Sequence, residues 1–337
     1  MATMEAYVLE SYGGPEVLQR KAIPLPEPQG DEVRVQVKAV GINRADLLQR
    51  RGRYPQPGEK PPFEVPGLEF AGIVEKAAPG AHVHLKELGL QVGSPVMGLL
   101  SGGAYAQFVV THPRLLLPLP EGLSFTQGAA IPEAYLTAWD GLLQGGFSLG
   151  KAVLIPAGGS GVGVAATQLV KAGGGTAITL SRTPRKVELS RDVGADRALL
   201  VGTDDVAREV REATGGRGVD LVLELVAGPH LVEHLQLLSP KGTVVVIGTL
   251  GGGEVSLPLG LLMAKRARLV GTLMRSRPLE EKMDLVQRFS REILPLFASG
   301  TLVPRVHEVV PWEEGPRAHQ ILEENQNFGK VVLEVAS

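Results

Sequence analysis

Between residues 152 and 247 the chain alternates short apolar segments with segments of helical periodicity, and this alternation limits the possible folds more than any other feature. Each apolar segment is a continuous run, as in strands that are buried on both faces. The runs lie at 152–156, 176–180, 198–200, 221–225 and 243–247, with helical segments at 162–171, 185–193, 206–214 and 230–238. Buried strands joined by helices predict a doubly wound parallel sheet, and therefore an α/β domain.

The residues on either side of this region have a different pattern. Residues 1 to about 120 contain short strands separated by Gly and Pro, such as the alternating segment 32–40, and one helical segment at 44–50 for which Asn43 is a suitable N-cap. A helix over 129–143 would hold Pro132 in its first turn. After residue 268 the pattern predicts a short strand, then a helix over 279–298, a strand over 305–309, a helix over 312–325 and a strand over 330–335.

Composition excludes several classes of protein. The length of 337 residues suits two domains. The net charge of −2 gives no electrostatic reason to expect nucleic acid or an anionic membrane as a partner. Because the chain has no cysteine, disulfides, thiolate catalysis and cysteine-ligated metals are excluded. We expect a cytoplasmic protein, since the first residues do not resemble a secretory signal and no stretch has the ~18 apolar residues of a membrane span.

A glycine-rich turn, AGGSGVG at residues 157–163, connects the first buried strand to its helix. Glycines let the backbone approach a pyrophosphate, and the helix N-terminus offers unpaired N–H groups to it. Val164 breaks the strict G-x-G-x-x-G pattern, but the strand-turn-helix context favours a dinucleotide site over a turn without a ligand. A Walker loop would need a lysine and a nucleophile elbow would need glycine at Val162, so Ser160 is predicted to contact phosphate or ribose.

The end of the second strand indicates which dinucleotide binds. An NAD site places an acidic side chain there to accept a hydrogen bond from the ribose 2′-hydroxyl. This chain has Ser181, Arg182 and Lys186 instead, which can donate to a 2′-phosphate. Two charge-assisted hydrogen bonds of ~1.5–3 kcal/mol each would favour NADPH by roughly two orders of magnitude or more. A solvated helix start would also tolerate these residues, but the missing acid favours NADPH.

Several segments together make the chain similar to a known family: NRADLLQR at 43–50, PGLEFAG at 66–72, AIPEAYLTA at 130–138, SGVG at 160–163 and NFGKVVL at 327–333. Over nearly its whole length the chain resembles the zinc-free quinone oxidoreductases related to zeta-crystallin, in the medium-chain dehydrogenase/reductase superfamily. It looks most similar to the tumour-suppressor-inducible members. The resemblance implies a GroES-like, partly open β-barrel catalytic domain at 1–122 and 268–337, and a Rossmann NADPH-binding domain at 123–267. It also implies a homodimer or homotetramer joined through the nucleotide-binding domains.

The resemblance also assigns cofactor contacts. The matching positions are Ser160, Gly161 and Val162 for the pyrophosphate turn, Ser181, Arg182 and Lys186 for the 2′-phosphate pocket, and Gly248, Leu250 and Thr137 towards the nicotinamide half. Asn43, also assigned as a cofactor contact, matches with Tyr54 the polar groups at the substrate end. Asn327 falls in a loop that closes over the cofactor in the family. Val201 or Gly202 stands where many relatives place a tyrosine against the adenosine phosphate, which is a departure from the family pattern.

The same resemblance bears on metal binding. Zinc-containing relatives carry a cysteine, a histidine and a cysteine or acid, and the matching positions here are Asn43, Leu68 and Glu133. One acid cannot hold zinc, so we expect no metal. The histidine pairs His82/His84, in a hairpin-like loop, and His230/His234, on a crossover helix, are expected to be surface residues.

These observations predict hydride transfer from NADPH to a small quinone or enone. Conjugated acceptors need less polarisation than simple ketones, so position and a few donors can replace a metal. The resemblance makes Asn43, Tyr54 and Thr137 the catalytic candidates, with Asn43 and Tyr54 as donors to the oxyanion and the proton supplied by water or through Tyr54. Glu69 and Asp46 are expected to be structural. The alternatives are an enone or alkenal reductase, and a non-catalytic NADPH-binding structural or sensing protein.

Overall fold

The computed structural model describes residues 2–54, 58 and 61–335. The chain divides into two compact units, of which unit 1 comprises Met1–Leu136 and Met274–Ser337 and unit 2 comprises Thr137–Leu273. The sequence placed the boundaries at 122/123 and 267/268. The two units instead meet at 136/137, within helix α4 (Pro132–Gln144), and at 273/274, after the last strand of unit 2.

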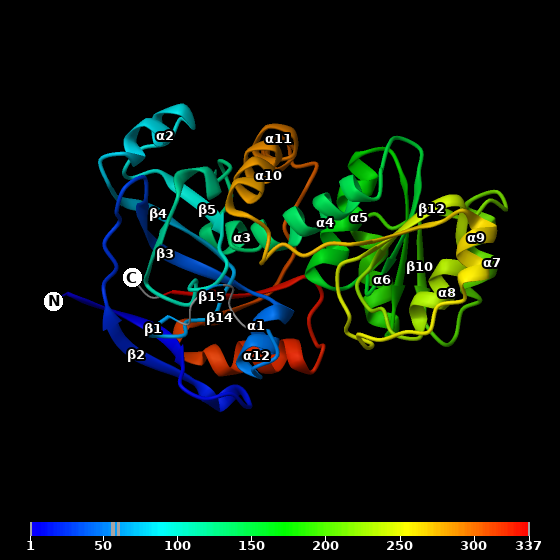
Figure 1. The fold of residues 1–337 in the computed structure, drawn as a ribbon, viewed down its shortest axis with the longest axis horizontal. Helices are drawn as coiled ribbons and strands as arrows, with labels where there is room; N and C mark the ends of the chain where they lie inside the picture. The colour runs from blue at the N-terminus through cyan, green and yellow to red at the C-terminus, as the bar shows by residue number, and fades with distance from the viewer. Residues whose placement is uncertain (1, 55–57, 59–60, 336–337) are drawn as a thin grey trace. The chain divides into compact units, whose positions relative to one another are not determined.

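Unit 2 is built on a parallel sheet with the strand order β10-β9-β8-β11-β12-β13, drawn in green to yellow in Figure 1. Its strands are β8 (Ala152–Pro156), β9 (Thr176–Ser181), β10 (Arg197–Leu200), β11 (Val219–Glu224), β12 (Leu238–Val246) and β13 (Arg268–Gly271). Neighbouring strands are all parallel. The doubly wound parallel sheet predicted from the sequence is therefore confirmed, and its order reverses between β8 and β11, where such sheets bind ligands.

Helices connect these strands. They are α5 (Gly161–Ala172), α6 (Pro184–Asp192), α7 (Val206–Ala213), α8 (His230–Gln236) and α9 (Leu259–Lys265). Every residue of β8 is buried, as a continuous apolar run requires. Strand β12 begins at Leu238, earlier than the apolar run at 243–247 suggested, because Leu238 already pairs with Val219 of β11. The register then shifts, and pairing resumes at Thr243.

Unit 1 contains a largely antiparallel sheet with the order β14-β15-β3-β4-β5-β7, with β6 paired to β3, and a separate hairpin of β1 and β2. Its strands are β1 (Thr3–Leu9), β2 (Leu18–Pro24), β3 (Val33–Ile42), β4 (Glu69–Ala77), β5 (Pro95–Leu99), β6 (Phe108–Thr111), β7 (Leu116–Pro118), β14 (Val306–Pro311) and β15 (Lys330–Glu334). The C-terminal strand β15 pairs with β3, so the two ends of the chain share one sheet. This is the GroES-like arrangement that the resemblance implied.

The α-helices of unit 1, besides the start of α4, are α1 (Arg44–Arg50), α2 (Ala81–Glu87), α3 (Phe125–Gly128), α10 (Leu279–Glu292), α11 (Leu294–Ala298) and α12 (Gly315–Glu323). Helix α1 has the bounds expected from the sequence. The helix expected over 279–298 is divided into α10 and α11, because Pro295 cannot donate a backbone hydrogen bond and lies in the first turn of the second helix.

Helix α2 corrects one expectation, since His82 and His84 lie on a helix and not in a hairpin-like loop. Ala81 and Leu85 bury one side of this helix, with the spacing of four that a helix requires. Gly89, with φ of +68°, ends the turn in a left-handed conformation that favours glycine.

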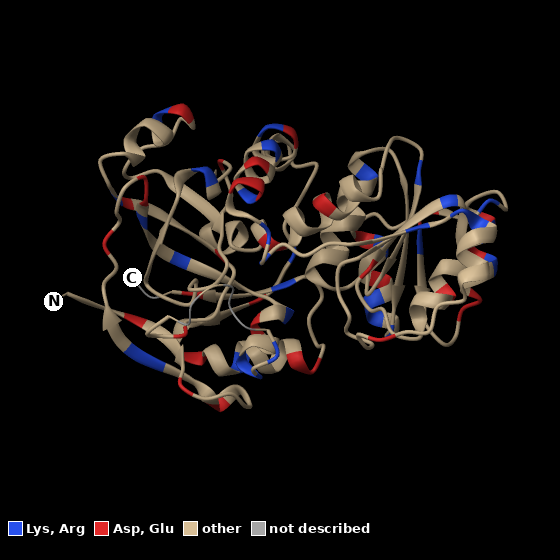
Figure 2. Ribbon diagram, viewed as in Figure 1, with Lys and Arg blue, Asp and Glu red and all other residues tan. Residues whose placement is uncertain are grey.

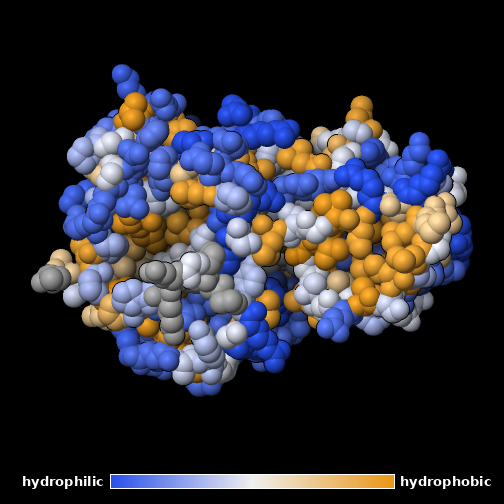
Figure 3. All heavy atoms as spheres, viewed as in Figure 1, coloured by the Kyte–Doolittle hydropathy of each residue, from blue (hydrophilic) through white to orange (hydrophobic). Residues whose placement is uncertain are grey.

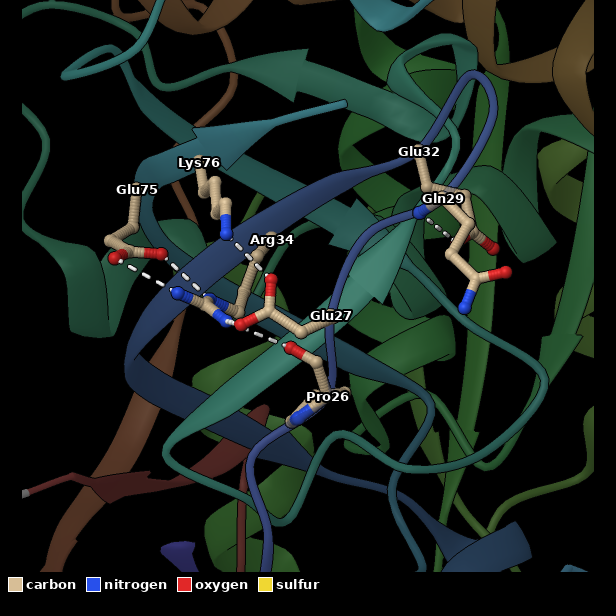
Figure 4. Close-up of polar contacts among 7 residues, drawn as sticks. All are labelled: Pro26, Glu27, Gln29, Glu32, Arg34, Glu75 and Lys76. Atoms are coloured by element: carbon tan, nitrogen blue, oxygen red, sulfur yellow. Dashed lines mark hydrogen bonds and ion pairs between the residues drawn. The ribbon is translucent and has the colours of Figure 1, made fainter. Parts of the chain in front are cut away.

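Charged side chains of unit 1 also connect its elements, as Figure 4 shows around Arg34 on β3. The Arg34 guanidinium donates from Nε to Glu75 Oε2 at 2.7 Å, and from Nη1 to the Pro26 carbonyl and Glu27 Oε1, both at 2.9 Å. Lys76 Nζ reaches the other oxygen of Glu27 at 2.6 Å. The network fixes the segment before β3 against the β3–β4 pair. Figure 2 shows basic residues interspersed with acidic ones in both units.

Candidate active site

The turn between β8 and α5 in unit 2 has the strand-turn-helix geometry predicted from the sequence. Ser160 is the N-cap of α5, and its Oγ accepts the Gly163 N–H at 3.0 Å. Gly161 and Val162 are the first two residues of the helix, so their N–H groups lie at its N-terminus. Ala157 adopts φ of +57°, which turns the chain sharply after the strand.

Two glycines of this turn are required by packing. A Cβ on Gly163 would lie 2.5 Å from the Ala157 carbonyl oxygen, and a Cβ on Gly158 would lie 2.6 Å from Thr179 Cβ. The turn is therefore held close to the end of β9 by residues without side chains. This compact arrangement suits the approach of a backbone to a phosphate group.

The end of β9 holds Ser181, Arg182 and, at the start of α6, Lys186. Ser181 is buried, and within the described part of the chain its Oγ has no hydrogen-bond partner. Arg182 is exposed and Thr183 is the N-cap of α6. A buried hydroxyl without a partner costs free energy unless a ligand or water satisfies it. These residues fit the ribose-phosphate end of a dinucleotide. Val201 and Gly202, one of which stands where the resemblance would place a tyrosine, are both exposed.

Two loops at the carboxyl ends of β11 and β12 are tied together. Buried Glu224 accepts the N–H groups of Val226 and Ala227 at 2.8 Å, and its Oε2 lies 2.5 Å from Nδ1 of His234. Burial acts to raise the pKa of Glu224, but the hydrogen bond from His234 and these amides bring it below its usual range. His234 is therefore a buried partner of a carboxylate, and its assignment as a surface residue was wrong.

The second of these loops contains Gly248 and Leu250. Gly248 N–H donates to the Glu224 carbonyl at 3.1 Å, Gly251 N–H donates to the Val226 carbonyl at 2.7 Å, and Leu250 is 54% exposed. Thr137, on α4, has a buried Oγ1 that lacks a hydrogen-bond partner among the described residues. The geometry thus leaves a hydroxyl of unit 2 and an exposed apolar side chain available to a ligand.

In unit 1 a buried ion pair lies beside Asn43. Lys330 Nζ is 2.6 Å from Glu69 Oε1, 2.5 Å from Asn43 Oδ1 and 2.7 Å from the Ile42 carbonyl oxygen. Asn43 Nδ2 donates to Glu69 Oε1 at 2.8 Å and to the Gly41 carbonyl at 3.3 Å. Both amide hydrogens of Asn43 are therefore engaged with the protein.

Asp46 of α1 continues this polar cluster inwards. Its Oδ2 accepts the Asn43 N–H at 2.8 Å and the Tyr105 hydroxyl at 3.0 Å. Burial raises the pKa of Asp46 to about 7. Asp46 and Glu69 both tie backbone segments together, as the sequence suggested, since Glu69 Oε2 accepts the Glu133 N–H at the start of α4.

Behind Asp46, Tyr105 Oη lies 2.9 Å from Nε2 of His319, whose Nδ1 lies 3.5 Å from Arg50 Nη1. Burial and the charge of Arg50 lower the pKa of His319 to about 3, so its ring is neutral. Because a guanidinium can only donate, Nδ1 accepts and Nε2 carries the proton. The hydrogen bonds then run in one direction, from Arg50 through His319 and Tyr105 to Asp46.

Tyr54 is half-buried beneath Arg275, whose guanidinium carbon lies 4.6 Å from the ring centre. Arg275 also donates to the Tyr54 carbonyl at 2.7 Å, the Ser101 carbonyl at 2.8 Å and Gln49 Oε1 at 2.9 Å. Burial and the charge of Glu133 raise the pKa of Tyr54 to about 12. Part of the loop after Tyr54, at 55–57 and 59–60, lies outside the described residues.

The donors near Asn43 do not fit a zinc ion. Leu68 has no donor atom, and the oxygens of Asn43 and Glu69 already surround the Lys330 ammonium. Elsewhere in unit 1, ligand atoms of Asp31, His84 and His112 lie within 4.8 Å of one another. His112 Nδ1 accepts the Arg114 N–H at 3.1 Å, so in the neutral ring Nε2 carries the proton. Neither ring nitrogen can then bind a metal unless the contact with Arg114 is lost.

The sequence-based assignment missed Arg275, Lys330, Tyr105 and His319. Lys330 stands in one of the segments that carried the resemblance, but nothing local signals that its ammonium reaches Glu69. Asn327 is buried and donates to the Gly329 carbonyl at 2.7 Å, within the loop that precedes β15. The contacts of Lys330 with Glu69, of Arg275 with Tyr54 and of His319 with Tyr105, by contrast, join residues more than 200 positions apart in the sequence.

Two protein families match separate parts of the chain. Residues 29–121 match the family described as "Alcohol dehydrogenase GroES-like domain", and residues 161–291 match the family described as "Zinc-binding dehydrogenase". "Quinone oxidoreductase" of Rattus norvegicus is 30% identical over 98% of this chain and 97% of its own. "Phthioceranic/hydroxyphthioceranic acid synthase" of Mycobacterium tuberculosis is 32% identical over 96% of this chain, which spans only 15% of that protein.

The fold is also similar to that of solved structures over nearly the whole chain. A mycobacterial protein complexed with NADPH superposes with a TM-score of 0.87 at 29% identity, over 98% of this chain and 100% of that chain. Among the residues that our structure describes, no helix is both long and apolar enough to cross a bilayer.

Proposed function

Because the chain belongs to the medium-chain dehydrogenase/reductase superfamily, among its quinone oxidoreductase-like members, we propose that it is a zinc-independent NADPH:quinone oxidoreductase. The superfamily consists of nucleotide-dependent oxidoreductases of small molecules. The observation that carries the proposal is the Lys330 ammonium between Asn43 and Glu69, because it occupies the donors that a catalytic metal would need.

NADPH is the proposed cofactor. Ser160, Gly161 and Val162 would hold its pyrophosphate, and Ser181, Arg182 and Lys186 its 2′-phosphate, supported by the buried Ser181 hydroxyl that has no partner within the described chain. Gly248, Leu250, Thr137 and Asn327 are the proposed contacts of its nicotinamide half and the loop over it. When bound, the reduced nicotinamide supplies a hydride.

The proposed substrates are quinones, whose conjugation stabilises the charge that hydride addition places on oxygen. Tyr54 presents a hydroxyl with a raised pKa, so it stays a hydrogen-bond donor over the whole neutral range. Asn43 would donate to an oxyanion only by exchanging its contact with Gly41 or Glu69. Its resting role is to hold Lys330 in place.

The activity is tested by mixing the protein with NADPH and 1,2-naphthoquinone and following absorbance at 340 nm. We expect NADPH to be consumed faster with the quinone than with an enone such as 2-cyclohexenone. Faster turnover of the enone would reassign the protein as an enone reductase. Tight NADPH binding without turnover of either acceptor would make it a binding protein and end the enzyme proposal.

Cofactor preference is tested with Arg182→Ala/Lys186→Ala. This double variant should weaken NADPH binding by roughly a hundredfold and leave NADH binding almost unchanged, because two charge-assisted hydrogen bonds to the 2′-phosphate are lost. Arg185→Ala, on the same helix but paired with Glu188, is the matched control. An equal loss of affinity for NADPH and NADH would contradict the phosphate-pocket assignment.

Zinc independence is tested by metal analysis of protein purified without chelators. We expect no stoichiometric zinc, and its presence would refute this part of the proposal.

We also propose that the protein is a homodimer or homotetramer joined through unit 2. Strand β13 ends the sheet order, and β13 and the neighbouring α9 expose Leu259, Met263 and Leu269. Figure 3 shows apolar side chains over the part of unit 2 that Figure 1 draws in yellow. An exposed strand edge beside apolar side chains favours pairing with a second copy.

A further inference from the structure

Among the described residues near Asn43, three carboxyl groups share one ammonium. They belong to Asp46 on α1, Glu69 on β4 and Glu133 on α4, and the ammonium is that of Lys330 on β15. Asp46 and Glu69 are almost fully buried, and Glu133 is half-buried. Lys330 lies within ion-pair distance of Glu69, whereas Asp46 and Glu133 make no ion pair among the described residues. A carboxylate taken out of water without a paired cation is unfavourable, so Asp46 and Glu133 favour the protonated form.

Glu69 is the carboxyl that pairs with the ammonium. Its Oε1 pairs with Lys330 at 2.6 Å and accepts from Asn43 Nδ2 at 2.8 Å, and its Oε2 accepts the Glu133 N–H at 2.8 Å. Through the last contact, a backbone N–H in the first turn of α4 donates to the Glu69 side chain. Two hydrogen-bond donors and the Lys330 ammonium therefore surround this carboxyl group.

Glu133 has the opposite surroundings. Within the described chain its carboxyl makes no ion pair and no hydrogen bond, while its own N–H holds the charged Glu69 close to it. Burial and the charge of Glu69 raise the pKa of Glu133 to about 8, so it carries a proton at pH 7. Of the three carboxyls, it is the one that combines a proton with partial exposure.

Besides Glu69, charged groups on several elements act on Glu133, and they do so in both directions. The cations Lys330 and Arg275 lower its pKa, and Asp46 raises it. The remaining titratable groups that interact with it are Tyr54 and Lys282, the latter with Nζ bound to Ser101 Oγ and the Arg275 carbonyl. Burial and the Glu69 charge exceed the effect of the two cations.

The other groups around Asn43 are poor proton donors. Both amide hydrogens of Asn43 are engaged. Lys330 Nζ faces three oxygen acceptors with its three protons. Tyr54, with a pKa of about 12, holds its proton too strongly to lose it readily at neutral pH.

We propose that Glu133, as a carboxylic acid, donates the proton that completes reduction of the substrate. This inference rests on the proposed function. Hydride addition gives the quinone or enone two electrons and leaves a hydroquinone anion or an enolate. The O–H bond of Glu133 breaks as an O–H bond forms on that oxyanion, which leaves Glu133 as a carboxylate. Because this carboxylate lies beside Glu69, it regains a proton from water before the next turnover.

The protonation state is tested without turnover by infrared difference spectroscopy of the wild type against Glu133→Gln. The difference spectrum should contain a protonated carboxyl band at pH 7 that disappears as the pH rises past about 8. Glutamine keeps the shape of the side chain, so folding is preserved, and a melting curve checks this. Absence of the band at pH 6 would overturn the proposal.

Catalysis is tested with acceptors that differ in the basicity of their reduced anion. Glu133→Gln should lower kcat roughly a hundredfold for enones, whose enolates are strong bases, and far less for quinones whose hydroquinone anions are weak bases. The wild-type kcat for enones should fall above pH 8, and the variant should lose this dependence. Glu121→Gln, an exposed carboxyl, is the matched control and should behave as wild type.

Equal kcat of wild type and Glu133→Gln on all acceptors would refute the role of Glu133 and leave the proposed function standing. If the wild type reduced no acceptor at all, the proposed function would fail and this role with it. The infrared band would then still report whether the carboxyl is protonated.

Discussion

The buried polar residues of unit 1 owe their protonation states to their neighbours. Arg50, Tyr105 and His319 are fully buried, and a directed set of hydrogen bonds leads from them to Asp46. A buried charge is tolerated where partners surround it, as for Glu69, and is avoided by protonation where they do not. The Oδ1 atom of Asp46, which has no hydrogen-bond partner in the described chain, fits the second case.

Asp46→Asn should therefore change how stability depends on pH. The pKa of Asp46 is about 7 in the folded protein and near its usual 3.8 when unfolded, so the folded state binds more protons between these values. The free energy of unfolding of the wild type therefore decreases as the pH rises from 4 to 7. In Asp46→Asn, which lacks the carboxyl, this decrease should be smaller by about 1–3 kcal/mol. Melting temperatures measured at pH 4.5 and pH 8 should show the variant gaining on the wild type at the higher pH.

Exposed Asp192→Asn is the control and should show no such gain. If the difference in melting temperature between Asp46→Asn and wild type were the same at both pH values, Asp46 would not titrate in this range.

At the scale of elements, the turn from β8 into α5 depends on close backbone approaches. Ser160 caps the helix through its Oγ, and Gly163 leaves room for the Ala157 carbonyl. The loops after β11 and β12 are held by Glu224 and its contacts with His234 and two amides. Each feature lies at the carboxyl edge of the parallel sheet, where doubly wound folds bind ligands.

Gly163→Ala should destabilise unit 2 by roughly 1–3 kcal/mol and weaken NADPH binding, because the new Cβ would lie 2.5 Å from a carbonyl oxygen and must displace the turn. Chemical denaturation and fluorescence titration with NADPH measure the two effects. Gly260→Ala in α9 has open space around its Cβ and should be neutral or slightly stabilising. Unchanged NADPH affinity in Gly163→Ala would mean that the turn does not position the cofactor.

At the scale of the whole molecule, the sheet of unit 2 ends at β13, and apolar side chains are exposed around it. Leu259 and Met263 of α9 are 67% and 76% exposed, and Lys265 is the only charged residue of this helix. Such exposure is unfavourable in a monomer in water. It is explained if a second copy covers the same face, in the isologous manner of a two-fold dimer.

Leu259→Glu/Met263→Glu should therefore convert the assembly into monomers, because four like charges would meet across a two-fold interface. Size-exclusion chromatography with light scattering measures the mass directly. Leu149→Glu, at an 83% exposed position in unit 2 away from α9, is the control and should keep the wild-type mass. A monomeric wild type, or an unchanged mass for the double variant, would place the interface elsewhere or remove it.

The sequence alone determined the parallel sheet, the glycine-rich turn between β8 and α5 and the approximate bounds of the strands and helices around them, because periodicity, capping and glycine chemistry act over a few neighbouring residues. It placed His84 in a loop, whereas the residue lies on α2, and it placed His234 at the surface, whereas the residue is buried, since burial of a histidine depends on what packs against it. Only the tertiary structure brought Lys330 to Glu69, Arg275 over Tyr54 and His319 to Tyr105. Each pair joins segments more than 200 residues apart, and the protonation of Glu133 depends on such a pair, so no local pattern could specify it.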